Sequence, residues 1–414
     1  MTNAFERDFF TDPGLVQDPS PYYAALRELG PVVREPHHGV FLISGIEEIL
    51  AVYADLDAFS SIAAPLGPFI PMPKPAEGES LADVVAHRRA EIPLSDLLVT
   101  LDPPEHGRHR SLLNKLFTPN RLKENEEFMW SLADRLIDEF ADRGEVEFCG
   151  AYAGPFTLLV IADLMGVPRE DHATFRGWLG RNVAGPTGGQ GSGDQMFAKL
   201  YPYFTRYIET RRASPGEDVM SQLATARFPD GKLPEVMDVM RISFIMFAAG
   251  QETTARLLGT GMRILAEQPA LADELRAEPE GIRNFIEECL RLESPIKGPF
   301  RLALRDTRLA GVDIPMGSLV MAMNGAANRD PRVFADGDRF DAKRANARRN
   351  IAFGHGEHFC PGASLARTEA RISFERLLTR LGDFALVDPS ALTYAPSFLI
   401  RGLNDLPLRF RRRS

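Results

Sequence analysis

The amino-acid sequence predicts a mainly α-helical protein that carries small β-sheets. Two long segments, Arg121–Arg143 and the residues from Pro234 to about Glu267, space their apolar side chains with the period of a helix. Strand-like segments are few and short, and they lie toward both ends of the chain. With 44% hydrophobic residues among 414, the chain can bury a large core around those helices.

The expected elements can be placed in chain order. Short apolar runs predict strands at Val32–Arg34 and Val40–Ile43, before a Pro-rich loop at Ala63–Glu79. Pro234 suits the first position of the second long helix, which would be about 50 Å long at 1.5 Å per residue. Its middle, Ile242–Ala249, is apolar on every side, as is typical of a helix buried all round. The remaining expected elements are strands at Arg308–Leu309, Val312–Ile314, Leu319–Met323 and Leu406–Arg411, and a polar loop at Asn328–Arg349.

Charge and cysteine content exclude several classes of protein. The chain holds 48 Lys and Arg against 57 Asp and Glu, whereas a nucleic-acid binder needs an excess of cations. The three cysteines cannot form a disulfide framework, so a reducing, cytoplasmic location is expected. No apolar run reaches the roughly 20 residues that a membrane-spanning helix needs. Because neither a repeat nor a linker divides the sequence, we expect a single domain over residues 1–414.

The most informative segment is Asn350–Arg367, NIAFGHGEHFCPGASLAR. Gly354 and Gly356 permit a tight turn that brings the backbone close to something large, and Cys360 follows. Pro361 suits the first position of a helix, so Cys360 is expected at a helix N-terminus, where N–H groups and the dipole stabilise a thiolate. From these residues alone, Cys360 has three open roles: a zinc ligand, a nucleophile or an axial ligand of haem iron.

The same segment resembles the signature of the cytochrome P450 superfamily, Phe-x-x-Gly-x-His/Arg-x-Cys-x-Gly. Its fixed positions are filled by Phe353, Gly356, His358, Cys360 and Gly362. The resemblance extends over most of the chain. It implies the cytochrome P450 fold, with haem b held between the long central helix and the helix of the cysteine loop, and with Cys360 as the axial ligand of the iron.

A second segment, Ala249–Thr254, lies midway along the long helix. A Glu in an apolar helix is costly unless it has a task, and Thr253 can donate a hydrogen bond back to a carbonyl. Ala249 and Gly250 leave a flat surface where a ligand can lie. The segment resembles the oxygen-binding stretch of the family, which implies that Glu252 and Thr253 deliver protons and that Ala249 contacts the haem.

A third segment carries Glu288 and Arg291, which are three residues apart and so share a helix face. By itself this pair is a weak signal, because solvated helix faces carry many such pairs. The family uses the same Glu-x-x-Arg pattern, which implies a buried structural triad completed by Arg339.

A fourth set of residues has the chemistry of a carboxylate site. His106 and Arg110 are four residues apart and share a helix face. They match family positions that bind a haem propionate, as do His358 and Arg301. Histidine and arginine suit that task because a buried carboxylate needs charge-assisted donors.

The expected substrate pocket follows from helical spacing back from Glu252 and Thr253 and from the family pattern. It is apolar, and the role of Lys297, which lies in the same stretch, is left open. The substrate is therefore expected to be a small hydrophobic molecule, of steroid, terpenoid, aromatic or fatty type. The pocket residues are Leu97, Leu98, Ile245, Ala248, Ala249, Ile296, Phe398 and Leu399.

The activity that the resemblance implies is monooxygenation, in which one atom of O2 enters the substrate and the other leaves as water. The chain contains no flavin or nicotinamide domain, so electrons are expected from NAD(P)H through ferredoxin reductase and ferredoxin. A peroxide-driven peroxygenase or isomerase and a non-catalytic haem- or ligand-binding protein are the alternatives. A monomer is expected. An acidic ferredoxin would suit the basic residues just before the cysteine loop, which are Lys343, Arg344, Arg348 and Arg349.

Overall fold

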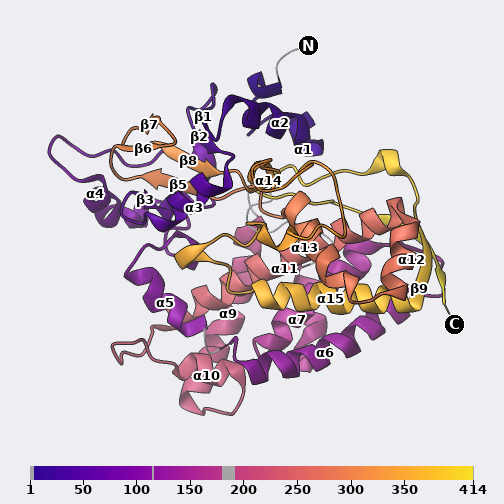
Figure 1. Cartoon of the computed structure of the whole chain (residues 1–414). Helices are drawn as coiled ribbons and strands as arrows, with labels where there is room; N and C mark the ends of the chain where they lie inside the picture. Colours follow the sequence, from indigo (N-terminus) through magenta and orange to yellow (C-terminus); the bar gives the residue numbers. More distant parts are fainter. Residues whose placement is uncertain (1–3, 114–115, 180–191, 414) are drawn as a thin grey trace.

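The computed structural model describes residues 4–113, 116–179 and 192–413, which form a helical body with a smaller β-rich part (Figure 1). The helices are α1 (Pro13–Gln17), α2 (Ser20–Leu29), α3 (Ile46–Ala54), α4 (Leu81–His87), α5 (Glu105–Leu113), α6 (Pro119–Asp138), α7 (Gly154–Leu164), α8 (His172–Leu179), α9 (Ser192–Ala213), α10 (Val219–Thr225), α11 (Val236–Glu267), α12 (Pro269–Ala277), α13 (Gly281–Leu292), α14 (Asn324–Ala327) and α15 (Ala363–Arg380). Short helical turns include η2 (Ser61–Ala63), η5 (Leu98–Thr100), η8 (Ala347–Arg349) and η9 (Gly356–His358).

The strands form three separate antiparallel or mixed sheets. The largest has the order β1-β2-β8-β5-β3, and only the β2–β8 pair in it is parallel. A second sheet has the order β4-β10-β9, and β6 pairs with β7 as a hairpin. The strands are β1 (Val32–Arg34), β2 (Phe41–Ile43), β3 (Phe59–Ser60), β4 (Glu145–Glu147), β5 (Phe300–Ala303), β6 (Thr307–Leu309), β7 (Val312–Ile314), β8 (Leu319–Ala322), β9 (Leu381–Leu386) and β10 (Pro407–Arg412).

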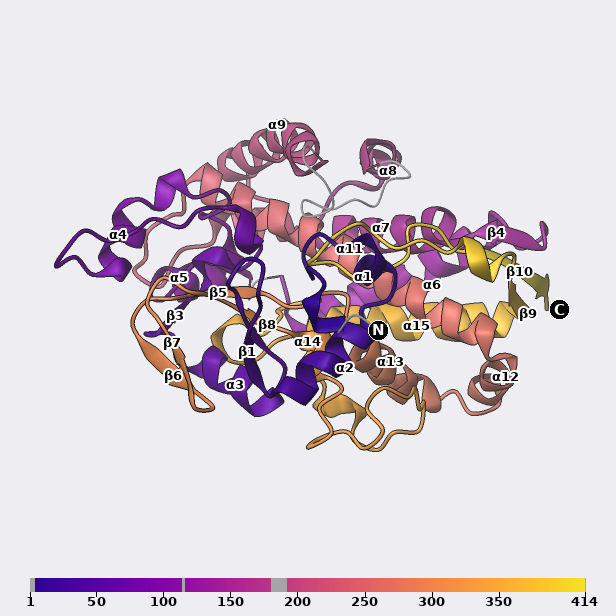
Figure 2. The same ribbon diagram turned by 90° about the horizontal axis from the view of Figure 1, so that it is seen from above.

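Helix α11 runs through the middle of the helical body and contacts α7, α9 and α15. Seen from above, α9 and α8 lie on one flank of α11, and α12 and α13 lie on the other (Figure 2). A capping box between Glu235 and Asp238 begins the helix. Pro234 therefore lies outside the helix, whereas the sequence suggested that it occupies the first helical position. Because Gly261 has no side chain, the ring of Phe374 on α15 packs directly against its backbone.

The core consists of one large cluster and two smaller ones. The large cluster joins the apolar faces of the central helices, including α6, α7, α11 and α15. A second cluster lies where the N-terminal residues cover the sheet, around Phe9, Phe10 and Phe300. A third lies between α3 and the same sheet, around Ile49 and Val320. The cysteine loop therefore lies between a helical core and a sheet core.

Most of the expected elements are confirmed, with shifted ends. Helix α6 begins two residues before the expected segment and ends at Asp138, because the chain turns at Phe140 and Gly144, whose φ is +71°. The expected strands are present, but β3, β4, β5 and β9 were not foreseen. Strand β5 is buried along its whole length and shows no alternation, so its pattern gave no strand signal.

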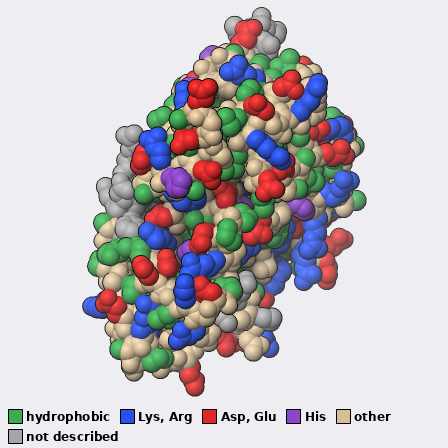
Figure 3. Space-filling model, turned by 90° about the vertical axis from the view of Figure 1, so that its left-hand side faces the viewer, with side chains coloured by type: hydrophobic (Ala, Val, Ile, Leu, Met, Phe, Trp, Pro, Cys, Tyr) green, Lys and Arg blue, Asp and Glu red, His purple; other side chains and the backbone are tan. Residues whose placement is uncertain are grey.

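Charges of both signs are interspersed over the face shown in Figure 3, and they are not segregated into one acidic or basic region. Many charges of the described residues are paired, and two ion pairs join α15 to α6 through Arg371 and Arg380. Within the described part of the chain, no helix combines the length and apolarity needed to cross a lipid bilayer.

Candidate active site

The segment that carries Cys360 is a tight loop between η8 and α15. Gly354 and Gly356 have φ angles of +70° and +68°, in the region that favours glycine, as the sequence predicted. The backbone N–H of Cys360 donates to the carbonyl of Phe353 at 2.9 Å, which closes the loop. The Phe353 ring lies 4.5 Å below the guanidinium of Arg367. The loop thus holds Cys360 in a half-buried position.

Helix α15 begins at Ala363, with Gly362 as its N-cap residue. Pro361 therefore lies before the helix, and the expectation that it occupies the first helical position is wrong. The φ and ψ of Gly362, −85° and 5°, are not those of a regular helix, and they place the start of the helix after the Cys360-Pro361-Gly362 turn. Cys360 still precedes the helix N-terminus closely enough to meet its free N–H groups.

The surroundings of the Cys360 sulfur act on its protonation in opposite directions. Burial raises the pKa of the thiol, and this effect is the largest. The backbone N–H of Gly362 and the positive charges of Arg110 and Arg367 favour the thiolate and partly offset burial. Such a sulfur is a poor free nucleophile, whereas a bound cation would stabilise its thiolate form.

Four basic side chains predicted to bind a carboxylate lie together beside this loop. The ring centroids of His106 and His358 are 4.0 Å apart, and His106 is only 1% exposed. Burial, reinforced by the positive charges of Arg301, His106 and Arg110, lowers the pKa of His358 to about 2. Burial also lowers the pKa of His106. The structure therefore brings together His106, Arg110, His358 and Arg301 from α5, β5 and the cysteine loop.

Neighbours that the sequence did not identify hold these side chains. His358 Nε2 lies 2.9 Å from the hydroxyl of Ser61, and His106 Nδ1 lies 2.8 Å from Oε1 of Glu357. Arg110 donates to the carbonyl of Phe359 at 2.8 Å. Ser61 is far from His358 in sequence, so no local pattern could have indicated this contact.

The residues fit a haem group, as two orphaned buried atoms indicate. Arg301 Nε and the Tyr53 hydroxyl are buried without a hydrogen-bond partner among the described residues, and the Arg301 guanidinium lies 5.2 Å from the centre of the Tyr53 ring. Burial lowers the pKa of Arg301, so its charge lacks compensation. Carboxylates such as haem propionates would supply it. Cys360 would then face the iron.

One stripe of α11 is accessible, although the middle of this helix is otherwise buried. Ile245, Ala249 and Thr253, spaced by four residues, are exposed or half-buried, whereas Gln251 is buried. The Thr253 hydroxyl donates to the Ala249 carbonyl at 2.7 Å, as the sequence predicted. Ala248, expected in the same pocket, is 5% exposed and faces the main core, because one helical residue is a rotation of about 100°.

Glu252 lies on a different side of α11 from Thr253. Its side chain is buried, and Oε1 lies 3.3 Å from Nη2 of Arg256, one turn further along the helix. Arg256 also donates to the carbonyl of Leu403. The buried carboxylate is therefore charge-paired, which avoids the cost of burying a lone charge.

The expected buried triad is present, but its third member differs. Glu288 and Arg291 are fully buried and are joined by two hydrogen bonds of 2.7 Å. Nε of Arg344 donates to Oε1 of Glu288 at 3.1 Å and completes the group. Arg339 is exposed, and only its backbone carbonyl takes part, accepting from Arg291 and Arg344. Arg344 replaces Arg339 because the loop folds back and directs the Arg344 side chain inward.

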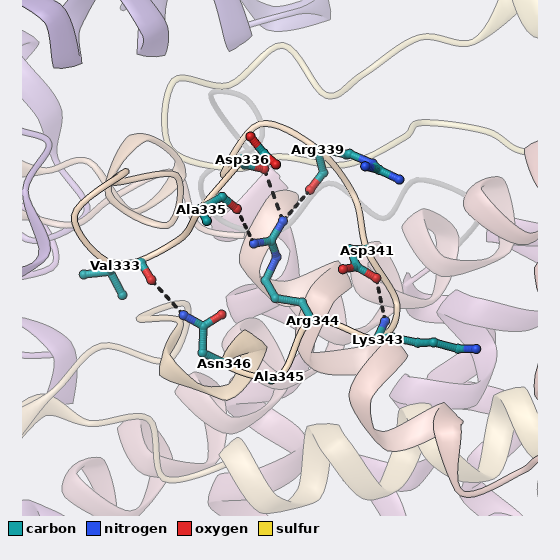
Figure 4. A pocket seen from close by; sticks show the side chains of 9 residues that line it. All are labelled: Val333, Ala335, Asp336, Arg339, Asp341, Lys343, Arg344, Ala345 and Asn346. Atoms are coloured by element: carbon teal, nitrogen blue, oxygen red, sulfur yellow. Dashed lines mark hydrogen bonds between the residues drawn. The ribbon is translucent and has the colours of Figure 1, made fainter.

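The loop around Arg344 encloses a pocket of about 390 Å³ (Figure 4). Arg344 points to the carbonyls of Ala335, Asp336 and Arg339, so its assignment to a surface that docks ferredoxin is wrong. The other three basic residues are exposed. Lys343 pairs with Glu274 at 2.5 Å, while no ion pair joins Arg348 or Arg349 to another residue in the described ranges.

The remaining expected pocket residues lie in different parts of the fold. Leu97 and Leu98 belong to the large core, where η5 contacts α11. Ile296 pairs with Ile400 in an isolated antiparallel bridge, and Leu399 is buried beside it. Phe398 packs edge-on against Phe10 and Phe300 in the second core cluster. Lys297, whose role the sequence left open, is buried and donates to the carbonyl of Ser397.

Comparison with known proteins shows the same family throughout. The family model described as cytochrome P450 matches residues 194–382. The cytochrome P450 monooxygenase PikC of Streptomyces venezuelae is 35% identical over 95% of this chain and 92% of its own length. The vitamin D(3) 25-hydroxylase of Pseudonocardia autotrophica is 32% identical over 96% and 95%. The substrate-free structure of CYP150A6 from Mycobacterium marinum is 46% identical, with a TM-score of 0.93 over 99% of this chain and 100% of that one.

A cysteine loop, a cluster of histidine and arginine side chains beside it and an accessible stripe on a long central helix are together typical of a haem-thiolate enzyme. The identities above extend over nearly the full length of both chains, and they show to which family of haem-thiolate enzymes this chain belongs. The chain belongs to the cytochrome P450 family, whose members use haem b, and it is a monooxygenase of that family.

Proposed function

We propose that this monooxygenase takes electrons from a ferredoxin and inserts one oxygen atom into a small hydrophobic molecule. One observation carries the proposal: α11, which bears the accessible stripe, packs against both α5, which bears His106 and Arg110, and α15, which follows the cysteine loop. Bound haem supplies the redox chemistry, and its thiolate ligand favours O–O bond cleavage. The residues of this chain bind, orient and protonate.

We assign Cys360 to the iron and the basic cluster of His106, Arg110, His358 and Arg301 to the propionates. Phe353 and Gly362 shape the loop around the sulfur, and Ala249 offers the exposed surface of α11. The support is the burial of His106 and Arg301 and the orphaned Nε of Arg301.

Proton delivery is assigned to Thr253 and Glu252. The Thr253 hydroxyl lies on the accessible stripe and is oriented by its bond to the Ala249 carbonyl. Glu252 is one residue away and buried, and its carboxylate is paired with Arg256. In this assignment Thr253 donates at the site by general acid chemistry. Glu252, after leaving Arg256 and taking up a proton from solvent, resupplies Thr253 through water.

The proposed substrate class rests on the apolar character of the residues assigned to the pocket. Ile245, Leu98, Ile296 and Leu399 are hydrocarbon side chains, and the neighbouring Lys297 has its ammonium bonded to the carbonyl of Ser397. Small-molecule sites of this kind bind by burial of apolar area with few polar contacts. A relative named for the hydroxylation of vitamin D(3) fits such a site.

The electron donor is proposed to be an acidic ferredoxin that docks near Lys343, Arg348 and Arg349. Arg348 and Arg349 form the short helix η8 directly before the cysteine loop. Their exposed charges lie on a chain with a net charge of −9, so they offer a local positive surface for an acidic partner.

The test is the reduced carbon monoxide difference spectrum of the haem-loaded protein. We expect the spectrum of a thiolate-ligated haem for the natural chain and for the Cys149→Ala and Cys289→Ala controls, because both of those cysteines are buried away from the loop. Cys360→Ala should lose that spectrum. A Cys360→Ala variant that keeps it would refute the assignment of the iron ligand.

Turnover then separates the proposal from its alternatives. With ferredoxin, reductase and NAD(P)H, a hydrophobic substrate should gain one oxygen atom derived from O2. Oxygen that comes from added peroxide without any reductant would instead establish a peroxygenase. Ligand binding that shifts the spectrum but never leads to product would establish a binding protein.

A further inference from the structure

Lys297 is a charged side chain in a place where an apolar one would suit better. It is 2% exposed, and its ammonium lies 5.7 Å from the centre of the Phe9 ring in the N-terminal layer. Burying an ammonium costs free energy unless hydrogen bonds and charges compensate. A methionine would fill a similar volume without that cost, so the lysine calls for a physical reason.

The reason lies in the turn that Lys297 holds. Its Nζ donates to the carbonyl of Ser397 at 2.7 Å, and its backbone N–H donates to the carbonyl of Leu399 at 2.8 Å. Inside the turn, the Ser397 hydroxyl accepts from the backbone N–H groups of Leu399 and Ile400, at 3.1 and 3.0 Å. The lysine thus fastens both ends of a turn that Ser397 organises from within.

This turn carries residues of the substrate pocket. Phe398 and Leu399 lie within it, and Ile400 at its end pairs with Ile296, the neighbour of Lys297. The backbone N–H of Arg401 donates to the carbonyl of Pro295 at 2.8 Å, which continues the pairing. One wall of the pocket is therefore fixed to residues 295–297 by backbone bonds and by a single buried ammonium.

Two further charges face this ammonium, and both are already engaged. Glu293 and Arg401 form an ion pair of 2.8 Å, and Arg401 also donates to the carbonyls of Val16 and Gln17. The Lys297 ammonium therefore has the Ser397 carbonyl as its hydrogen-bond acceptor and the Phe9 ring as a cation–π partner. Its directional contact is with the pocket turn.

We infer that Lys297 is a positioning residue for substrate: it does not touch the substrate, but it fixes the Ser397–Ile400 turn and so sets where Phe398 and Leu399 stand. This inference rests on the proposed function, because it takes the Ile296 and Leu399 region to be the substrate wall. A chain without this clamp would accept the same cofactor and would bind hydrophobic ligands with altered affinity and orientation.

The experiment compares two probes of the haem-loaded enzyme, imidazole and phenylimidazole. Both bind iron through nitrogen and shift the absorption spectrum, but only the phenyl group needs the pocket wall. Lys297→Met should weaken phenylimidazole binding roughly tenfold, the effect of losing one hydrogen bond to a charged group, and leave imidazole binding unchanged. Lys123→Met, which removes an exposed lysine on α6, is the matched control and should change neither affinity.

A second variant tests whether the lysine acts through the turn. Ser397→Ala removes the internal hydrogen bonds of the turn and should also weaken phenylimidazole binding. If both residues fix the same turn, the double variant should bind phenylimidazole only slightly less tightly than whichever single variant binds it less tightly, because coupled sites are not additive.

Two results would overturn the inference: a ratio of the two affinities that stays within about twofold of the natural chain in Lys297→Met, or full additivity with Ser397→Ala. Failure of the proposed function looks different. Imidazole would then give no spectral shift in any variant, and the reduced protein would not show the carbon monoxide spectrum of a thiolate-ligated haem.

Discussion

Thr253 and Ser243 make the same kind of hydrogen bond on the same helix. The Thr253 hydroxyl donates to the carbonyl of Ala249 and the Ser243 hydroxyl to that of Val239, each four residues earlier. They differ in surroundings, because Thr253 lies on the accessible stripe and Ser243 is fully buried. Substituting each of these two residues in turn therefore separates the structural effect of a hydroxyl on α11 from its effect on the reaction.

Thr253→Ala should reduce the yield of oxygenated product per NAD(P)H consumed by about 10²-fold, the usual contribution of a positioned general acid. Reducing equivalents should then appear as peroxide or water. Ser243→Ala should leave this ratio unchanged. Coupled product formation and peroxide release, measured in parallel, check both outcomes, and an equal loss in the two variants would point to helix distortion alone.

Lys297 makes the free energy of unfolding depend on pH, with a defined sign. Burial lowers its pKa from 10.5 to about 7. Between these values the unfolded chain binds more protons than the folded one, so stability rises with pH across this window. Below it the lysine is charged in both states, and the cost of burial applies in full. Glu293 and Arg401 face the same ammonium, but they remain charged throughout this range.

The free energy of unfolding of the natural chain, relative to Lys297→Met, should therefore increase from pH 7 to about pH 10. Thermal or urea unfolding at several pH values measures it. Lys123→Met should show no such trend, because its lysine is exposed in both states. A difference between the natural chain and Lys297→Met that is flat in pH would contradict the lowered pKa of Lys297 in the folded protein.

At the residue scale, the spacing of residues within short motifs predicted much of the candidate site. Cys360, Gly356 and His358 lie within one short motif, so the sequence alone predicts that they act together. Ser61 and Glu357 escaped notice because each acts through a partner more than 200 residues away. The assigned catalytic roles of Glu252 and Thr253 stay predictions.

At the scale of elements, the loop from Asn328 to Arg349 shows why an inward side chain is hard to predict. It carries several arginines in similar surroundings, and the family pattern favoured Arg339 for the triad. The fold selects Arg344, because the loop directs this side chain toward Glu288 and toward three backbone carbonyls. Which arginine turns inward depends on the path of the loop, and sequence spacing does not specify that path.

Arg344→Gln should destabilise the protein by about 3 to 5 kcal/mol, since it leaves the buried carboxylate of Glu288 with one cation fewer. Arg339→Gln should cost less than about 0.5 kcal/mol, because its exposed side chain can be replaced without touching the backbone carbonyl that takes part. Urea unfolding of the haem-loaded variants compares the two. A larger loss in Arg339→Gln would restore the arrangement expected from the sequence.

Helix α11 illustrates what periodicity can predict about an element. Its length and its C-terminal end agree with the sequence, because these features depend on side chains within the helix. Its middle is not buried all round as predicted, because Ile245 is half-buried and Ala249 is exposed. Its start is shifted by the capping box at Glu235. The unforeseen strand β3 has only two residues and gains its strand character from pairing with β5.

At the scale of the whole molecule, a net charge of −9 would repel an acidic partner unless local charges outweighed it. The exposed Arg348 and Arg349 precede the cysteine loop at one end of α15. Arg411 and Arg412 pair with β9 at the other end of this helix, which at 18 residues spans about 27 Å. The two arginine pairs thus differ in their distance from Cys360, and Arg411 and Arg412 are in addition ion-paired with Asp383 and Asp142.

Changing Arg348 and Arg349 together to Gln should slow reduction by an acidic ferredoxin about tenfold at low ionic strength, and the difference should shrink as salt screens the charges. The same double change at Arg411 and Arg412 alters net charge equally and should have little effect. Stopped-flow reduction at several salt concentrations makes the comparison. Equal slowing by both pairs would mean that only net charge matters.

The fold of the whole chain agrees with the family that the cysteine motif indicated, so this conclusion was within reach of the sequence. That the chain acts as one domain and as a monomer stays a prediction. Both depend on surfaces whose energetics a single sequence does not encode in any local pattern.

The hydrogen bonds from Arg401 to the carbonyls of Val16 and Gln17 have a consequence for folding during synthesis. Val16 and Gln17 are synthesised before Arg401, which follows them by more than 380 residues. At a synthesis rate of about 5 to 20 residues per second, their carbonyls lack this partner for tens of seconds. The segment around Val16 therefore reaches its final contacts only after Arg401 has been made.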